Sequence, residues 1–176
     1  QLTDCTGFYL SSYHHSEELH AVNSLGAWTE VAIAQYEGII FIGACGIAVR
    51  AIAPFIQNKV NDPAVISLDD EGRFIISLLS GHLGGANELA QEIADLTKGT
   101  AVISTATDNH HVWAIDQWAK KNQCMISDYS IAKKISAALL AGREIGITTI
   151  FKRQKLSVPN IFWAESGPLG MVIDLN

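Results

Sequence analysis

The chain has few cysteines, no metal-ligand spacing and no long apolar run. Its 176 residues include three cysteines, Cys5, Cys45 and Cys124, which lie far apart. An odd, scattered set argues against a disulfide framework and for a reducing cytoplasm, which is the location we predict. Neither Cys-x-x-Cys nor His-x-x-x-His spacing occurs, so we expect no metal site held by the protein.

No apolar stretch approaches the ~20 residues that a membrane-spanning helix needs, so we expect no membrane partner. Basic residues are scarce early in the chain, because residues 1–116 contain four basic residues and fourteen acidic ones. The net charge of the whole chain is -6. Because no extended basic stripe occurs, we expect no nucleic-acid partner. The densest basic cluster, Lys152-Arg153-Gln154-Lys155, is either a solvated turn or an electropositive rim for an anionic ligand. These features leave the oligomeric state open, a homo-oligomer included.

Apolar runs alternate with helical patterns along the chain. Hydrophobic residues make up 48% and charged residues 17%, which is typical of a packed globular protein. The alternation predicts an α/β fold, a three-layer sandwich with a mostly parallel sheet, plus a second, smaller α/β part. We place a boundary near Asp108, which gives an N-terminal domain over 1–108 and a middle domain over 109–176. The expected strands are 7–10, 38–42, 65–68, 74–79, 101–103, 145–150, 161–163 and 171–173, and the expected helices are 25–34, 46–55, 86–96, 112–119 and 131–140.

Two local signals refine this pattern. The turn Asp69-Asp-Glu-Gly72 joins two of the expected strands and is a hairpin signal, so it predicts one antiparallel pair within the sheet. Ser24 immediately precedes the first expected helix and is its predicted N-cap.

Three turns follow apolar strand candidates within the first part of the chain. They are Gly43–Arg50, Gly81–Glu88 and Ser104–Asp108. Glycine allows the backbone to approach a ligand closely, and ligands of open α/β sheets sit at strand ends. The turns therefore predict a site for a polar or anionic small molecule, and we expect the first two to face one shared cleft.

The first and third turns offer binding groups. Arg50 lies one helical turn beyond Gly46. Its guanidinium either makes bidentate hydrogen bonds to a carboxylate or phosphate beside the Gly43–Gly46 amides, or pairs with a local acid on the surface. Thr105, Thr107 and Asp108 either bind a polar ligand or cap the next helix, and capping is the favoured interpretation for Asp108.

The second turn holds the best catalytic candidate, His82, which lies between Gly81 and the pair Gly84-Gly85. Histidine titrates near neutrality and serves as a general acid or base, although it could also only brace the turn. Asn87 and the glycines before it are alternative helix caps, and Asn87 and Glu88 are also ligand contacts in the functional interpretation. The candidate catalytic residues are thus His82, Glu88 and Asp108, and the candidate substrate-binding residues are Gly43, Gly46, Arg50, Gly84, Gly85, Asn87, Thr105 and Thr107.

Four segments, taken in order, carry a family resemblance. They are Phe41-Ile-Gly-Ala-Cys-Gly-Ile-Ala-Val-Arg-Ala-Ile-Ala-Pro54, Asn61-Asp-Pro-Ala-Val65, Ser77-Leu-Leu-Ser-Gly-His-Leu-Gly-Gly-Ala-Asn-Glu-Leu89 and Thr105-Ala-Thr-Asp108. Together they resemble the cobalt-precorrin-5A hydrolases of the anaerobic cobalamin pathway. The similarity is dense over 38–108 and looser through 126–128 and 135–146.

The resemblance implies a hydrolase. Members open the δ-lactone on ring A of a cobalt-bound, ring-contracted tetrapyrrole and release acetaldehyde, leaving cobalt-precorrin-5B. The implied partner is a cobalt-bound corrin precursor, whose acetate and propionate groups suit Arg50 and helix N-termini. His82 could activate water, and amides of the glycine turn could hold the oxyanion. Cobalt arrives inside the substrate, so no cofactor held by the protein is expected.

Longer members of the family carry a further C-terminal domain and usually begin with an additional strand and helix, and we expect this chain to lack both. Two other interpretations therefore stay open. One is a non-catalytic module that binds a corrinoid or another anionic tetrapyrrole, with activity in the missing C-terminal domain. The other is an unrelated hydrolase of small acyl esters.

Overall fold

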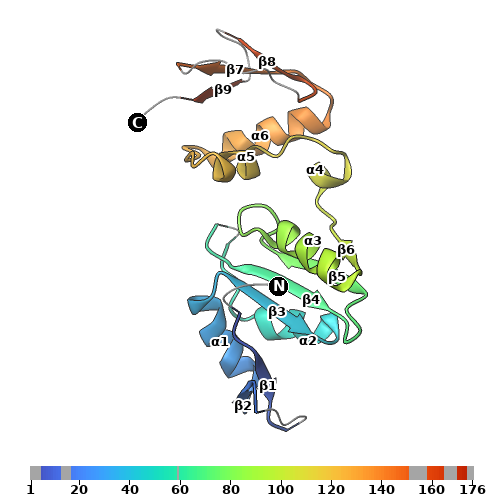
Figure 1. Cartoon of the computed structure of the whole chain (residues 1–176). Coiled ribbons are helices and arrows are strands. Elements are labelled where there is room, and N and C mark those ends of the chain that lie inside the picture. Colours follow the sequence, from blue (N-terminus) through green and yellow to red (C-terminus); the bar gives the residue numbers. More distant parts are fainter. Residues whose placement is uncertain (1–4, 13–16, 59, 151–157, 165–169, 174–176) are drawn as a thin grey trace. The chain divides into compact units, whose positions relative to one another are not determined.

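The computed structural model describes residues 5–12, 17–58, 60–150, 158–164 and 170–173 (Figure 1). The chain divides into two compact units, residues 1–103 and residues 104–176. Each unit has its own sheet and its own apolar core. The basic cluster Lys152-Arg153-Gln154-Lys155 lies outside the described residues.

A four-stranded sheet forms the centre of the first unit, in the order β3-β4-β5-β6. The strands are β3 (Gly38–Ile42), β4 (Ala64–Leu68), β5 (Phe74–Leu79) and β6 (Thr100–Val102). β3 runs parallel to β4 and β5 runs parallel to β6, whereas β4 and β5 are antiparallel. The predicted hairpin is confirmed, and the N–H of Gly72 closes its turn on the carbonyl of Asp69 at 3.0 Å.

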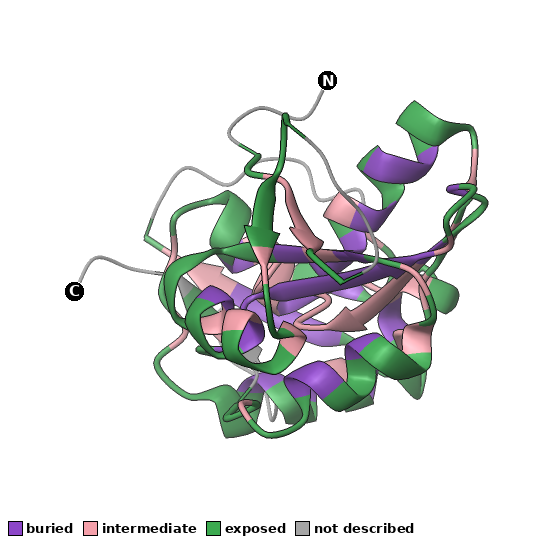
Figure 2. Ribbon diagram, turned by 90° about the horizontal axis from the view of Figure 1, so that it is seen from below, coloured by how far each residue is buried: buried purple, intermediate pink, exposed green. Residues whose placement is uncertain are grey.

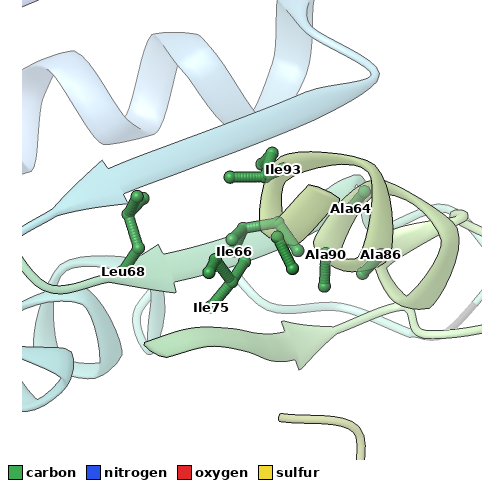
Figure 3. Packing of buried hydrophobic residues seen from close by; sticks show 8 residues of the cluster. Ala64, Ile66, Leu68, Ile75, Ala86, Ala90 and Ile93 are labelled. Carbon is green, nitrogen blue, oxygen red and sulfur yellow. The ribbon is translucent and has the colours of Figure 1, made fainter. Parts of the chain in front are cut away.

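Helices cover both faces of this sheet. Along β4, alternate side chains point to opposite faces. Ala64, Ile66 and Leu68 pack with α3 (Ala86–Thr97), whereas Val65 packs with α1 (Leu25–Gln35) and α2 (Cys45–Ile52) on the other face. Buried residues accordingly run through the sheet and along one side of the helices (Figure 2). Figure 3 shows Ile66 and neighbouring apolar side chains of the first of these clusters.

The ends of α1 and α2 follow from local chemistry. Ser24 caps α1 as predicted, because its Oγ accepts the N–H of Ala27 at 3.3 Å. α2 ends at Ile52, three residues short of the predicted end. The proline at position 54 has no N–H to continue the helical ladder, which limits the helix to this length.

A small sheet precedes these elements. It pairs β1 (Phe8–Leu10) with β2 (His20–Val22) in parallel, and β2 was not predicted because three residues are too few to show a strand pattern. The Phe8 ring lies 5.3 Å from the Trp28 ring of α1, and Trp28 in turn lies 5.9 Å from Phe41 of β3. Aromatic contacts therefore connect this small sheet to the main layers of the unit.

The second unit has a parallel sheet in the order β8-β7-β9. Its strands are β7 (Ile145–Thr149), β8 (Ile161–Trp163) and β9 (Gly170–Ile173), and its helices are α4 (Ala106–Asn109), α5 (Ile115–Lys121) and α6 (Tyr129–Leu140). Ile135 and Leu139 of α6 pack against Ile145 and Ile147 of β7. The predicted fold class, a three-layer α/β sandwich with a smaller α/β part, is confirmed. None of the helices in the described part of the chain is long and apolar enough to span a membrane.

Candidate functional site

Residues 80–85, which we call the glycine–histidine loop, connect β5 to α3. Ser80 enters the loop in a left-handed conformation with φ 55°, which is uncommon for a residue with a side chain. Two carbonyls of the loop accept N–H groups of α3: Ala86 donates to Ser80 at 3.2 Å and Asn87 donates to Gly81 at 3.0 Å. The loop is thus folded back onto the first turn of the helix.

Close packing explains one of the loop glycines. A Cβ on Gly84 would collide with the Ser80 side chain, and it would lie 2.8 Å from the Ser80 carbonyl oxygen and 3.3 Å from the Ala64 nitrogen. No side chain fits at this distance from backbone atoms. Gly84 is therefore required to close the loop on itself and on the start of β4, whether or not a ligand binds there.

Asn87 is buried between the loop and β5. It is 5% exposed, and its Oδ1 accepts a hydrogen bond of 2.7 Å from Ser77 Oγ on β5. It does not cap α3, because the helix begins at Ala86 and Gly85, with φ 87°, occupies the cap position. Of the two caps considered from the sequence, the glycine is the one found. The role of Asn87 in binding substrate stays a prediction.

His82 and Glu88 lie on either side of the helix start. His82 is half-buried within the loop, and Glu88 is exposed in the first turn of α3. The N–H of Gly85 donates to the carbonyl of His82 at 3.1 Å, so this amide is already engaged. The Gly84 amide donates to no acceptor within the described residues, which makes it the better candidate for holding a developing negative charge.

Three polar residues of this region were not singled out from the sequence. Ser77 supports the loop from β5, and Ser80 is the first residue of the loop. Asp62 lies beside the loop, because Ser80 Oγ donates to the Asp62 carbonyl at 2.8 Å. The available signal was the polar side chain of Ser77 within an otherwise apolar strand. A buried polar side chain of this kind needs a hydrogen-bond partner.

The Gly43 turn follows β3. Gly43 has φ 142°, which favours glycine, and its N–H donates to the Leu68 carbonyl at 2.8 Å. Arg50 lies in the last turn of α2, exposed, and its Nη1 donates to the Gly46 carbonyl at 3.4 Å. The guanidinium is thus folded along its own helix rather than onto a local acid.

The Gly43 turn and the glycine–histidine loop lie at opposite ends of the strands. Ile42, which precedes Gly43, pairs with Leu68 at the end of β4, whereas Leu79, which precedes the loop, pairs with Val65 near the start of β4. The prediction of one shared cleft is therefore wrong. The two turns are separated because the β4–β5 hairpin is antiparallel, which reverses the direction of the strand that carries the loop.

The third predicted turn lies in the second unit. Thr105 occupies the cap position of α4 without a side-chain cap bond, and Thr107 is 7% exposed. Asp108 lies inside α4, and Ala114 occupies the cap position of the next helix, α5, so the interpretation of Asp108 as the cap of that helix is wrong. Ligand binding by these three residues stays a prediction. In the part of the chain that the structure describes, no group of three or more His, Cys, Asp or Glu is placed to hold a metal ion.

These features define a three-layer α/β domain with a glycine–histidine loop at the start of a helix. Residues 27–108 match the family model described as Cobalamin synthesis G N-terminal.

Curated relatives carry related descriptions. A cobalt-precorrin-5A hydrolase of Salmonella typhimurium is 42% identical over 117 residues, which cover 66% of this chain and 33% of the relative. One of Priestia megaterium is 38% identical over 112 residues, which cover 64% of this chain and 30% of the relative. The chain therefore matches about a third of the length of these proteins.

A solved structure shows the same fold. It is described as a cobalamin biosynthesis protein G homolog from Sulfolobus solfataricus, with a TM-score of 0.52 and 24% sequence identity. The match covers 90% of this chain and 50% of that one. At this identity the likeness bears on the fold alone.

Proposed function

We propose that this chain forms part of a cobalt-precorrin-5A hydrolase that acts in cobalamin biosynthesis. The observation that carries the proposal is the 42% identity over 117 residues to a relative of that description. The family match over residues 27–108 includes the whole glycine–histidine loop. The proposed substrate is a cobalt-bound corrin precursor, and cobalt enters the site within it, so the proposal assigns no separate cofactor to the protein.

The proposed reaction opens the ring A δ-lactone of cobalt-precorrin-5A. Water attacks the lactone carbonyl, a bond from its oxygen to the acyl carbon forms, and the ring C–O bond breaks to give a carboxylate and a hydroxyl group. A two-carbon fragment then leaves as acetaldehyde, which gives cobalt-precorrin-5B. The protein has to activate the water and stabilise the oxyanion that develops on the carbonyl oxygen.

The glycine–histidine loop offers groups for both tasks. His82 is assigned to accept the proton of the attacking water, the Gly84 amide to donate to the oxyanion, and Glu88 to assist proton transfer at the rim. Arg50, Gly43 and Gly46 are not assigned to the same cleft, because the strand register puts their turn at the other end of the sheet. Thr105, Thr107 and Asp108 remain proposed substrate contacts.

A second candidate function is a corrinoid-binding module without activity of its own. The observation in its favour is that the chain matches only about a third of the length of its curated relatives. Catalysis by such a module would require groups from outside the matched region.

One assay separates the two functions. The 176-residue chain is incubated with cobalt-precorrin-5A under anaerobic conditions, and acetaldehyde is measured together with substrate binding. His82→Gln is compared with His110→Gln, a matched histidine change in the second unit. Acetaldehyde release that is lost only in His82→Gln supports the hydrolase and the assignment of His82, whereas binding without release by the parent chain supports the module.

A further inference from the structure

Two tryptophans of the second unit form a partly exposed aromatic pair. Trp113 precedes α5 and Trp118 lies within it, and their ring centroids are 5.6 Å apart with an interplanar angle of 57°. Trp113 also packs against the buried core of the unit. Both side chains are partly open to solvent. The pair therefore presents an apolar surface that is anchored on the core.

The tryptophan of α1 is arranged differently. The ring of Trp28 lies 5.3 Å from Phe8 of β1 and 5.9 Å from Phe41 of β3, so it links two strands. Among the described residues, Trp118 has one ring contact, with Trp113, and no strand contributes a ring to it. Packing between strands thus accounts for Trp28, whereas contact with a ligand is open to Trp118.

Positive charge accompanies the aromatic pair. Lys121 follows Trp118 by three residues in α5, a spacing that puts two side chains next to each other on the surface of a helix. Lys121 is exposed and makes no ion pair within the described residues. Residues 104–176 carry eight basic and six acidic side chains, whereas residues 1–103 carry four basic and twelve acidic ones. The second unit is therefore the part of this acidic chain whose net charge favours an anionic ligand.

The aromatic pair also adjoins α4 along the chain. The N–H of Val112, the residue before Trp113, donates to the carbonyl of Thr107 at 2.8 Å. This bond closes the turn that leads from α4 to Trp113. The polar side chains of α4 that are already proposed as substrate contacts and the aromatic pair thus belong to one short stretch of the second unit.

We propose that Trp113, Trp118 and Lys121 form a binding surface for the corrin macrocycle, with the indole rings against its apolar face and the ammonium group beside one of its carboxylates. This inference rests on the proposed function, which supplies a cobalt-bound corrin precursor as the ligand. Such a molecule combines a broad apolar ring system with acetate and propionate groups at its rim. An aromatic surface bordered by a cation matches both parts.

The first test measures the affinity of the 176-residue chain for dicyanocobyrinic acid, a diamagnetic cobalt corrin with free carboxyl groups, by calorimetry. We expect Trp118→Leu to weaken binding by about tenfold or more, because the apolar face of the ligand loses an aromatic contact. Trp28→Leu is the matched control and should change the affinity by less than about twofold, since that ring lies between strands. Equal affinities of the two variants would overturn the proposal.

The second test concerns the charge. Lys121→Gln should weaken binding of dicyanocobyrinic acid by about two- to fivefold at low ionic strength, and the difference should shrink as salt is added. Lys98→Gln removes the same charge from an exposed position at the end of α3 and is the control. Dicyanocobinamide, whose corrin side chains are amides, should bind the parent and Lys121→Gln equally. Equal losses in the two lysine variants would contradict the assignment of Lys121.

A third readout needs no variant to fold. Dicyanocobyrinic acid added to the parent chain should shift the indole N–H resonances of Trp113 and Trp118 in NMR spectra, with little change at Trp28. Absence of shifts at Trp113 and Trp118 would overturn the inference. Acetaldehyde release from cobalt-precorrin-5A tests the proposed function separately. A chain that shows the shifts but releases no acetaldehyde keeps the binding surface and loses the assignment as a hydrolase.

Discussion

Ser77 on β5 donates a hydrogen bond of 2.7 Å from its Oγ to Oδ1 of Asn87 in the first turn of α3. Both residues lie within the unit that carries the glycine–histidine loop, and Asn87 also donates its backbone N–H to the Gly81 carbonyl. A Cβ on Gly81 would lie 2.7 Å from that same Oδ1. The strand, the loop and the helix therefore meet at one buried amide, which fixes the shape of the loop before any ligand arrives.

The first prediction concerns this amide. Ser77→Ala and Asn87→Ala should each lower the free energy of unfolding by about 1–3 kcal/mol, because each leaves a partly buried polar group without its partner. In a double-mutant cycle measured by urea unfolding, the two changes should couple by about 1 kcal/mol. Ser11 and Asn23 form a similar but exposed bond of 2.9 Å and serve as the control pair. Coupling no larger in the buried pair than in the exposed pair would contradict this account.

The second prediction is that two glycine substitutions change the free energy of unfolding in opposite directions. Gly84→Ala should destabilise the chain by about 1–3 kcal/mol, because the new methyl group meets backbone atoms that cannot move away. Gly46→Ala should stabilise it by about 0.5–1 kcal/mol, because residue 46 lies within α2 and its Cβ would only touch the flexible end of Arg50 at 3.5 Å. Chemical denaturation of both variants checks the pair, and an equal effect of the two changes would refute it.

The third prediction concerns acid stability in the second unit. Asp128 caps α6, and its Oδ1 accepts the N–H of Ser130 at 2.7 Å. The pKa of Asp128 is lowered from its ordinary value of 3.8, first by the Ser130 hydroxyl and then by the N–H groups of Ile131 and Ser130. Because the pKa is lower in the folded chain, the stabilisation is fully present above the ordinary pKa and is lost as the pH falls through the folded value.

Asp128→Ala should therefore lower Tm at neutral pH, and the difference from the parent should shrink below about pH 4. Asp128→Asn is the control, because asparagine caps helices nearly as well without the charge. Thermal melts monitored by circular dichroism between acid and neutral pH measure both. A difference between Asp128→Ala and the parent that stays constant across this range would show that the charge of Asp128 contributes nothing.

The fourth prediction tests the core beneath α3. Ile66 is 0% exposed, so Ile66→Ala should cost about 2–5 kcal/mol through lost burial and the cavity left behind. Ile42→Ala removes the same atoms from a side chain that is 73% exposed and should change the free energy of unfolding by less than about 0.5 kcal/mol. Urea unfolding of the two variants provides the comparison, and similar losses would mean that Ile42 is covered in solution.

Regular elements were predictable where one physical signal dominates. The apolar run Gly38–Ile42 predicted a strand and the Asp69–Gly72 turn predicted the hairpin, and both are found. β3 is not buried on both faces, however, because it is the edge strand of the sheet and Ile42 is exposed. The short strand β2 and the four-residue helix α4 lack such a signal and were missed.

The geometry of the candidate site was less predictable than its location in the sequence. The glycine pattern located the loop, but its relation to the Gly43 turn depends on strand direction across the whole sheet. The antiparallel hairpin puts Gly81 at the opposite end of the sheet from Gly43, and the local pattern around either glycine does not report this separation. Asp62 and Ser77 act through contacts with residues 18 and 10 positions away in the chain, and no local pattern reports such contacts.

The reversal between β4 and β5 also bears on how the first unit folds. β4, β5, α3 and β6 follow one another in the chain, and each contacts the one before it, so this stretch closes only short loops. Low sequence separation between contacts favours rapid folding. We expect residues 64–102 to gain structure first, with slower amide exchange at Ile66 and Ile75 than at β3 as the check. The hairpin that separates the two glycine turns in space would then also be the nucleus on which the rest of the unit condenses.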